Sequence, residues 1–290
     1  MTTLFGRITV AGVGLVGGSL ALAVRKAGAA AEVVGFGRTA RNLEVALERG
    51  LVDRVTQDAA EAARDADLIV LATPVGACAA LAEKFRAHAR PGTILTDVGS
   101  VKTAIVAALE ARWVGVGPVI GGHPIAGSEE SGAGAARADL FRDRRCILTP
   151  TPAADPAAVT RVGALWQAVG ARVEEMPPAM HDEILARVSH LPHVVAYALV
   201  HVVADLQIGG RRVLDYAGTG FRDTTRIAAS PADVWRDIAL ANAGPLRSAL
   251  AEFRAVLDAL ERFVAADDGA GLEAELAAAR GARQRLARGS

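Results

Sequence analysis

A histidine in a glycine-rich segment is the residue best suited to acid–base chemistry in this chain. His123 is the third residue of GGHPIAGSEESG, residues 121–132. Pro124 biases His123 towards an extended backbone, which limits where the imidazole can point. The flanking glycines let a ligand approach the backbone closely, and imidazole can take or give a proton near neutral pH. A surface loop with an incidental histidine is the alternative that this segment alone leaves open.

Two more histidines, His190 and His193, lie three residues apart in SHLPH, residues 189–193. If this segment is helical they share one face, and Pro192 is expected to distort the helix locally. A metal site is one interpretation, but no third ligand of suitable spacing accompanies the pair. Ordinary core histidines are another interpretation. A substrate pocket is favoured once the next polar segment is considered.

That segment, GTGFRDTTRIA at residues 218–228, combines flexible glycines with Arg222, Asp223 and Arg226. A guanidinium group binds a carboxylate in a planar, bidentate way, so the segment indicates a site for an anionic substrate. A solvated loop whose charges cancel is the alternative.

The elements that would position these residues begin with a βαβ unit. A β-branched run at residues 7–11 is followed by GVGLVG at residues 12–17, an Ala/Leu-rich helix, and a second strand at residues 32–36. A glycine motif that follows a strand and opens a helix predicts a dinucleotide site. The glycines admit the pyrophosphate, and the helix N-terminus supplies N–H donors. The residues expected to contact the cofactor here are Gly12, Gly14, Leu15, Val16 and Gly17.

The residues after the second strand indicate which cofactor is used. Enzymes that use NAD usually carry Asp or Glu at the end of this strand, where it hydrogen-bonds the ribose hydroxyls. Here that position is Gly37, and Arg38, Thr39 and Arg41 follow. A missing carboxylate with added guanidinium groups favours a 2′-phosphate, and hence NADP over NAD. NAD remains the alternative if the two arginines are simply solvated at the start of a helix.

Strands and helices continue to alternate beyond this unit, with strands expected at residues 67–72, 93–98 and 119–120. In a doubly wound, mostly parallel sheet the carboxyl ends of the strands line one crevice. We therefore expect an α/β Rossmann domain whose strand ends carry the polar residues that meet the cofactor. The residues just past these strand ends are Thr73, Pro74, Ser100 and His123.

The pattern changes after Pro177-Pro178, beyond which the chain is mostly helical and shows no convincing parallel strand. We expect residues 1–175 to form the dinucleotide-binding domain and residues 176–290 to form an all-α domain that binds substrate. The apolar character of these helices predicts a homodimer through the helical domain.

Composition excludes several classes of function. The 290 residues are 51% hydrophobic and 22% charged, which is typical of a well-packed globular protein. Lys+Arg and Asp+Glu both total 32, so the chain has no general electrostatic reason to bind nucleic acid or an anionic membrane. The two cysteines, Cys78 and Cys146, form neither a disulfide framework nor a metal motif. We expect a soluble, cytoplasmic protein without a bound metal.

Together the polar segments resemble the prephenate/arogenate (cyclohexadienyl) dehydrogenase family of tyrosine biosynthesis. The matching stretches run in the family's order from about residue 7 to about residue 245. The glycine motif is shared with many dehydrogenases, whereas the other four stretches in combination are specific. The stretches are GVGLVGGS at 12–19, DVGSVK at 97–102, GGHPIAGSE at 121–129, SHLPH at 189–193 and GFRDTTRIA at 220–228.

The resemblance implies oxidative decarboxylation of a cyclohexadienyl acid, either arogenate or prephenate. Hydride would leave the ring carbon that bears the hydroxyl and go to the nicotinamide, while the ring carboxylate leaves as CO2 and the ring becomes aromatic. It implies that His123 accepts the hydroxyl proton and that Ser100 lies between His123, substrate and nicotinamide. Arg226 would bind a substrate carboxylate. The other pocket residues that it implies are His190, His193, Ser189, Arg222, Asp223, Glu129 and Trp235.

Two other functions fit parts of the pattern. One is an NADP-dependent 3-hydroxy acid dehydrogenase of related two-domain build, but such enzymes commonly use a lysine on the helical domain, and no lysine follows residue 176. The other is a non-catalytic NADP-binding sensor, against which the clustering of Ser100, His123 and Arg226 counts. The residues do not show whether prephenate or arogenate is the substrate, since the two differ only in a side-chain keto group or amino group. They also do not show whether tyrosine inhibits the enzyme by feedback.

Overall fold

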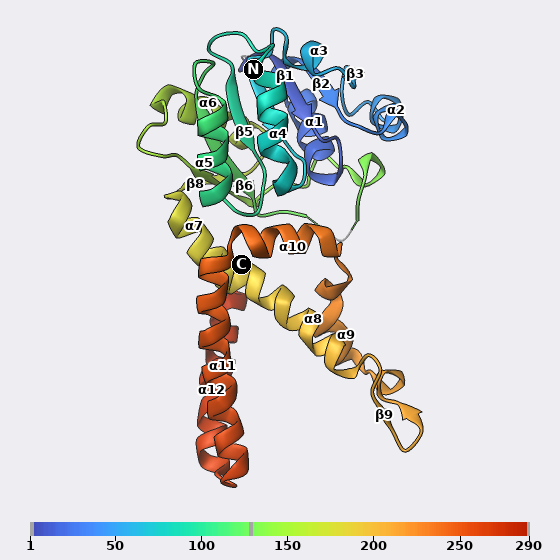
Figure 1. The fold of residues 1–290 in the computed structure, drawn as a ribbon, viewed down its shortest axis with the longest axis vertical. Helices are drawn as coiled ribbons and strands as arrows, with labels where there is room; N and C mark the ends of the chain where they lie inside the picture. The colour runs from blue at the N-terminus through green and yellow to red at the C-terminus, as the bar shows by residue number, and fades with distance from the viewer. Residues whose placement is uncertain (1–2, 128–129, 289–290) are drawn as a thin grey trace. The chain divides into compact units, whose positions relative to one another are not determined.

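An eight-stranded sheet forms the centre of the N-terminal part of the chain in a computed structural model that describes residues 3–127 and 130–288 (Figure 1). The strands lie in the order β3-β2-β1-β4-β5-β6-β7-β8. All neighbouring pairs are parallel except β6 with β7, so β7 and β8 run opposite to the other six. The strands are β1 (Phe5–Ala11), β2 (Ala30–Phe36), β3 (Arg54–Thr56), β4 (Leu68–Leu71), β5 (Ile94–Asp97), β6 (Val119–Pro124), β7 (Arg145–Thr149) and β8 (Arg172–Glu175).

Helices cover both faces of this sheet because its strands are apolar on both sides. Along β4, Leu68 and Val70 face one core cluster and Ile69 and Leu71 face the other. The first cluster includes residues of α1, α2 and α6, and the second includes residues of α3, α4 and α5. These helices are α1 (Leu15–Ala27), α2 (Ala40–Glu48), α3 (Ala59–Ala63), α4 (Val75–Arg86), α5 (Thr103–Arg112) and α6 (Pro156–Ala168). The expected doubly wound α/β domain is confirmed.

The strand order places the expected crevice. The chain moves outwards from β1 to β2 and β3, then returns to place β4 on the other side of β1. The direction of winding therefore reverses between β1 and β4, and ligands of such sheets bind outside the strand carboxyl ends at this point. The loops after β1, β4, β5 and β6 all belong to this edge.

The chain beyond β8 is helical apart from one short hairpin. The predicted distortion near Pro192 is present as a π-helical turn that directly precedes the helix beginning at Leu191. The elements are α7 (Pro178–Leu185), η2 (Ala186–His190), α8 (Leu191–Val203), the hairpin β9 (Gln207–Ile208) with β10 (Arg211–Arg212), η3 (Val213–Tyr216), α9 (Thr219–Thr225), η4 (Arg226–Ala229) and α10 (Ala232–Ala241). A short turn, η1 (Ala133–Ala135), precedes β7.

By internal packing the chain divides into Met1–Ala243 and Gly244–Ser290. In the first unit α10 returns to the Rossmann domain, where it packs on α4 and its Ile238 joins the core. The second unit contains α11 (Ala243–Ala265) and α12 (Gly269–Arg288), joined by a tight turn at which Phe263 lies against Gly271. Among the described residues, no helix is both long and apolar enough to cross a membrane.

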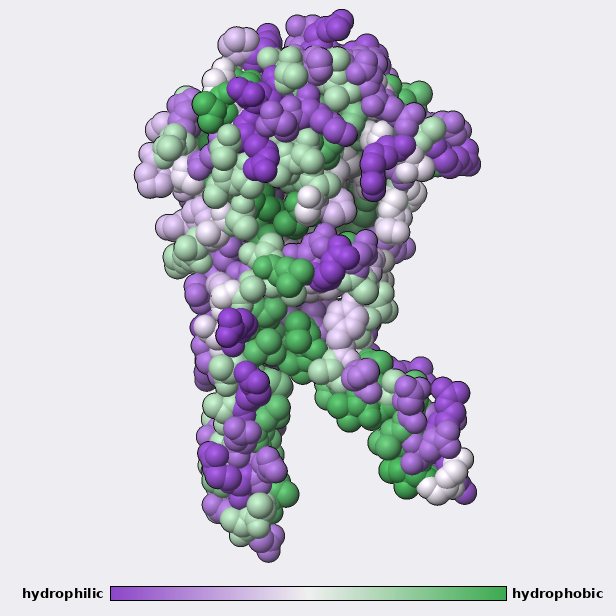
Figure 2. Space-filling model, in the orientation of Figure 1, coloured by the Kyte–Doolittle hydropathy of each residue, from purple (hydrophilic) through white to green (hydrophobic). Residues whose placement is uncertain are grey.

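The outer surface of α8 and the following hairpin carries many apolar side chains, visible as a green area in Figure 2. Its large exposed residues are Leu199, Val202, Leu206 and Ile208. This apolar surface is unusual for a helix that faces only water.

Candidate active site

His123 lies at the carboxyl end of β6, as its second-last residue and not just past the strand as expected. Its backbone is held in the antiparallel pair with β7, where it is opposite Ile147. Ladder pairing and the following proline fix the backbone, so the side chain of this half-buried residue has few positions available. Its Nδ1 is 2.8 Å from Nε2 of His181, which leaves the Nε2 edge of His123 without this partner.

His181 connects His123 to a buried carboxylate. The His181 side chain on α7 is fully buried, and its Nδ1 is 2.8 Å from Oδ1 of Asp182. The backbone N–H groups of Lys102 and Thr103 donate to the Asp182 carboxylate at 2.7 and 2.8 Å. Burial alone raises the pKa of Asp182, but the hydrogen bonds from His181, Thr103 and Lys102 hold it below its ordinary value.

A buried ion pair ties together the ends of β5 and β6. The Lys102 ammonium is fully buried, contacts the Asp97 carboxylate and donates to the Gly122 carbonyl at 2.8 Å. Asp97 also accepts from the backbone N–H groups of Gly99 at 2.7 Å and Gly122 at 3.3 Å. Gly99, which precedes Ser100, is therefore held by Asp97, and Gly122, which precedes His123, is held by both charges.

This environment keeps His123 neutral. Burial is the main cause that lowers the pKa of His123 well below its ordinary value, and His181, Lys102 and His190 lower it further. A neutral imidazole beside a buried ammonium group can accept a proton from a ligand at neutral pH.

His190 is buried in the same network. The side-chain amide of Asn242 donates to the carbonyl of Asp182 at 2.9 Å and lies 3.0 Å from Nδ1 of His190. Because both amide hydrogens are used in this way, His190 Nδ1 is an acceptor and the ring proton is on Nε2. Burial lowers the pKa of His190 to about 4, which the nearby Asp182 opposes only in part, and the Ser100 backbone lies beside the ring.

His193, Trp235 and Arg226 form the next part of the site. The ring of His193 stacks on Trp235 with centroids 3.4 Å apart, and its Nδ1 is 2.9 Å from the Ser189 carbonyl. Trp235 also meets His190 edge-on, so both histidines of SHLPH contact one aromatic wall. Burial is the main cause that lowers the pKa of His193, and the nearby charge of Arg226 adds to this effect. The contacts with Trp235 join His193 to His190 and so to the network of His123, and Arg226 lies close enough for its charge to act on His193.

The glycine motif fits a dinucleotide pyrophosphate. Gly12 has φ +98, and a Cβ there would lie 2.4 Å from the Ala72 carbonyl oxygen, so only glycine permits this approach of the β1 and β4 loops. A Cβ at Gly14 would meet no heavy atom within 4 Å. The space at the N-terminus of α1 is therefore open, and its N–H groups can receive an anion. Leu15 is buried behind the turn, while Val16 is partly buried.

The end of β2 presents a second possible anion site. Arg38, Thr39 and Arg41 are all exposed at the start of α2. Thr39 is the N-cap residue of α2 but makes no side-chain cap hydrogen bond, and the first turn contains no acidic residue. Arg41 is 3.4 Å from Glu44 in an exposed pair, and such a pair contributes little stability.

The other predicted residues that the structure describes are not part of the hydrogen-bonded network of His123. Thr73 and Pro74 lie between β4 and α4, and the Thr73 hydroxyl is 3.8 Å from the Cys78 sulfur. Arg222 and Asp223 are exposed on α9, where Arg222 donates to the Ala217 carbonyl at 3.2 Å. Glu129 lies outside the described residues.

Sequence reasoning missed three residues of the network, His181, Asp182 and Asn242, and it did not identify the Asp97–Lys102 ion pair. The HD dipeptide at residues 181–182 lies in the mostly helical region after Pro177-Pro178, and nothing in its local sequence indicates a role in a site. A signal was present, because DVGSVK contains the chain's one lysine between residues 85 and 290, directly after a buried strand.

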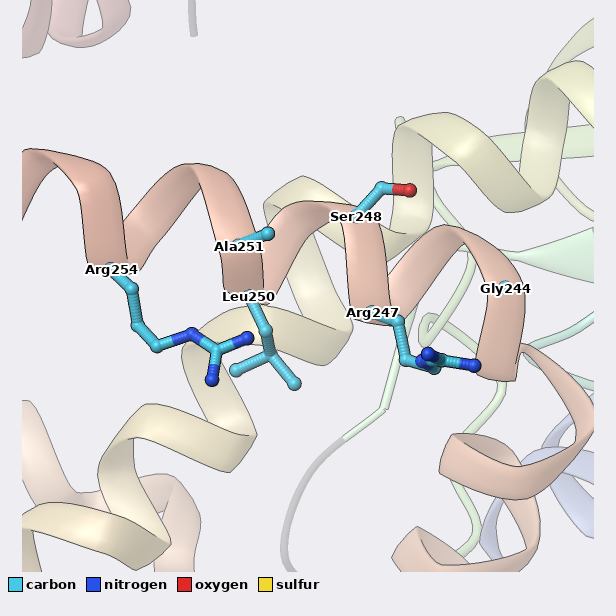
Figure 3. A pocket seen from close by; sticks show the side chains of 6 residues that line it. All are labelled: Gly244, Arg247, Ser248, Leu250, Ala251 and Arg254. Atoms are coloured by element: carbon cyan, nitrogen blue, oxygen red, sulfur yellow. The ribbon is translucent and has the colours of Figure 1, made fainter.

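A surface groove of about 410 Å³ lies elsewhere, along α11 in the second unit (Figure 3). Figure 3 shows the side chains of Arg247, Leu250 and Arg254 on one side of this helix. None of the predicted site residues lines this groove.

The Rossmann turn, the neutral histidine at a strand end and the helical region that follows define an NAD(P)-dependent dehydrogenase. Comparisons with known proteins specify the family. Residues 20–175 match the family model described as "Prephenate dehydrogenase, nucleotide-binding domain", and residues 177–278 match "Prephenate dehydrogenase, dimerization domain". The chain belongs to the prephenate dehydrogenase family.

Relatives that align with nearly the full length of the chain support its membership of this family. The chain is 35% identical to a cyclohexadienyl dehydrogenase of Zymomonas mobilis, an alignment that covers 92% of this chain and 91% of the relative. Its fold is similar to that of prephenate dehydrogenase from Aquifex aeolicus in complex with hydroxyphenyl propionate and NAD+, with a TM-score of 0.92, 32% identity and coverage of 97% and 98%. It is also similar to a Synechocystis arogenate dehydrogenase, with a TM-score of 0.83, 33% identity and coverage of 97% and 99%.

Proposed function

We propose that this enzyme oxidatively decarboxylates a cyclohexadienyl acid, prephenate or arogenate, and that it prefers NADP to NAD. The observation that carries the proposal is His123, a neutral imidazole at the carboxyl end of β6 whose Nδ1 is occupied by His181. Its Nε2 edge can therefore receive the proton of the substrate hydroxyl.

The reaction depends mainly on the correct alignment of the substrate and on a base for its hydroxyl. A bound nicotinamide would supply the acceptor for the hydride of the ring carbon that bears the hydroxyl. His123 takes the hydroxyl proton as that carbon is oxidised, and the bond to the ring carboxylate breaks to release CO2. The electron pair of this bond makes the ring aromatic, and the proton returns from His123 to the phenolate oxygen. Because aromatisation is strongly downhill, a base and correct alignment are the main requirements.

Charged and aromatic groups would orient the substrate. Arg226, near His193, would bind a substrate carboxylate through its planar guanidinium. The stacked His193–Trp235 pair would form an apolar wall, and Ser100, beside buried His190, would contact the substrate hydroxyl. We also propose pocket roles for Ser189, Arg222, Asp223 and Glu129.

The preference for NADP is supported by the residues after β2. Gly37 stands where a carboxylate would repel a 2′-phosphate, and the uncapped N-terminus of α2 lies beside Arg38. Thr39 and Arg41 add a hydroxyl donor and a second guanidinium group.

We also propose that the enzyme is a homodimer through its helical region, residues 176–290, with residues 1–175 as the dinucleotide-binding domain. The exposed apolar side chains of α8 supply a surface that a second copy could cover.

Steady-state kinetics with prephenate and arogenate, each with NADP and NAD, test the proposal. We expect turnover with at least one of the two acids and a higher kcat/KM with NADP. Arg38→Ala should lower kcat/KM for NADP by roughly 10-fold or more, since a charge-assisted hydrogen bond contributes about 1.5–3 kcal/mol, and should change that for NAD little. Arg86→Ala, an exposed arginine on α4, is the matched control. Equal losses for both cofactors would contradict the cofactor assignment, and absence of turnover with both acids would contradict the reaction.

A further inference from the structure

Three side chains form a continuous hydrogen-bonded chain that ends at the base. Asp182 Oδ1 is 2.8 Å from His181 Nδ1, and His181 Nε2 is 2.8 Å from His123 Nδ1. The first two side chains are almost fully buried, at 2% and 0% exposure, and only His123 reaches solvent. Water therefore does not compete for the inner bonds.

The charge state of Asp182 fixes the direction of the chain. Its carboxylate accepts from two backbone N–H groups at the N-terminus of α5, from Lys102 at 2.7 Å and Thr103 at 2.8 Å. An N–H group can only donate, and a helix N-terminus favours negative charge, so both contacts hold the carboxylate ionised. An ionised carboxylate can only accept, and His181 therefore carries a proton on Nδ1.

The remaining protons then follow. In neutral His181 the other nitrogen, Nε2, is an acceptor, so the hydrogen between the two rings belongs to His123 Nδ1. His123 Nε2 then has a free lone pair. Doubly protonated His181 would reverse this order and leave His123 with a proton on Nε2, unable to act as a base.

We propose that His181 and Asp182 are positioning residues that hold His123 in its Nδ1–H tautomer and so present Nε2 as the base. The catalytic consequence rests on the proposed function, whereas the tautomer itself does not. In water an isolated imidazole side chain favours the opposite, Nε2–H tautomer, so the protein has to impose this one. Asp182 also anchors the start of α5, three residues after Ser100. The same carboxylate therefore fixes both the tautomer of His123 and the position of the loop that contains Ser100.

Long-range ¹H–¹⁵N NMR of the histidine side chains tests the proposal directly. The chain has six histidines, and His123→Asn identifies the His123 signals by their absence. In the wild-type protein we expect ¹⁵N shifts of the Nδ1–H tautomer for His123 at neutral pH. The Nε2–H tautomer or a charged ring in the wild type would overturn the proposal, and this result needs no variant to fold.

Variants of His181 test whether this residue imposes the tautomer of His123. His181→Phe keeps a ring but removes both nitrogens, so His123 should revert to the Nε2–H tautomer. Turnover should fall by roughly 10²–10⁴-fold with little change in KM, the size of effect seen when a histidine base is left in the wrong tautomer. His181→Gln, which can place an amide oxygen opposite His123 Nδ1, should restore part of kcat. An unchanged tautomer in His181→Phe, or equal activity of the Phe and Gln variants, would overturn the positioning role. A wild-type enzyme with the expected tautomer but no turnover would instead reject only the proposed function.

Discussion

The neutrality of His123 arises from its surroundings and has a consequence for pH dependence. Burial first, and then His181, Lys102 and His190, lower the pKa of His123 well below its usual range. A base is active only when deprotonated, so activity is present above this lowered pKa and is lost as pH falls through it.

We therefore predict that kcat/KM is constant from neutral pH to below the ordinary histidine pKa of about 6.5, and declines only in more acidic solution. A pH profile of the wild-type enzyme at saturating cofactor measures this. The profile of Lys102→Met, which removes one neighbouring charge, should shift its decline towards neutral pH. A wild-type inflection at or above pH 6.5 would show that burial does not control this base.

At the residue scale, the sequence singled out the proposed ligand-binding residues but not the residues that support them. His123, His190, His193 and Arg226 stand in glycine-, proline- or arginine-rich segments whose composition is unusual. His181 and Asp182 stand at the start of an ordinary apolar helix. Their importance depends on the packing of α7 on α5 and β7, which brings His181 to His123 and Asp182 to the start of α5, and no local pattern reports this tertiary contact.

At the element scale, the buried Asp97–Lys102 pair joins β5 to β6. Removal of one partner leaves an uncompensated charge in the core, which typically costs about 3–5 kcal/mol, whereas removal of both is often tolerated. Lys102→Met should therefore lower the free energy of unfolding by about 3–5 kcal/mol.

Urea denaturation of Lys102→Met, Asp97→Asn and the double variant checks this estimate. The double variant should be more stable than the sum of the single losses predicts, because the two residues are in direct contact. Additive losses would mean that the ion pair does not couple the two strand ends.

The elements that the sequence predicted are those with strong internal signals. Buried strands such as β4 read as continuous apolar runs, and the glycine motif marks the start of α1. Missed were β3, α3 and the β9–β10 hairpin, all of five residues or fewer. Elements this short take their structure from neighbours: β3 exists because it pairs with β2. The π-helical turn was anticipated only as a distortion near Pro192, since its type depends on packing around His190.

At the scale of the whole molecule, the described site residues all lie in the first compact unit, residues 1–243. Because the net charge is zero, the proposed recognition of an anionic substrate depends on local arginines and not on a general field. The position of the expected boundary near residue 176 followed from a change in pattern, but the return of α10 to α4 could not be predicted, because it depends on the packing of Ile238 into a distant core.

The proposed homodimer gives a prediction at this scale. Val202 is 70% exposed on α8, and Val202→Asp would place a charge in the proposed apolar interface. Sedimentation analysis should show a dimer for the wild type and a monomer, or a dimer at least 10-fold weaker, for Val202→Asp. Leu47→Asp, at a 47% exposed leucine of α2, is the matched control and should remain dimeric. A monomeric wild type would remove this part of the proposal.

The central claim is that His123 is the base for the substrate hydroxyl, and His123→Asn tests it most directly. Asparagine retains a polar side chain of similar size but cannot accept a proton near neutral pH. Pre-steady-state and steady-state turnover should be measured with prephenate and arogenate, and cofactor binding should be titrated on the same samples. We predict a loss of kcat of about 10²–10⁴-fold with unchanged cofactor affinity. Turnover within a few-fold of the wild type, in a variant that still binds the cofactor, would contradict the account.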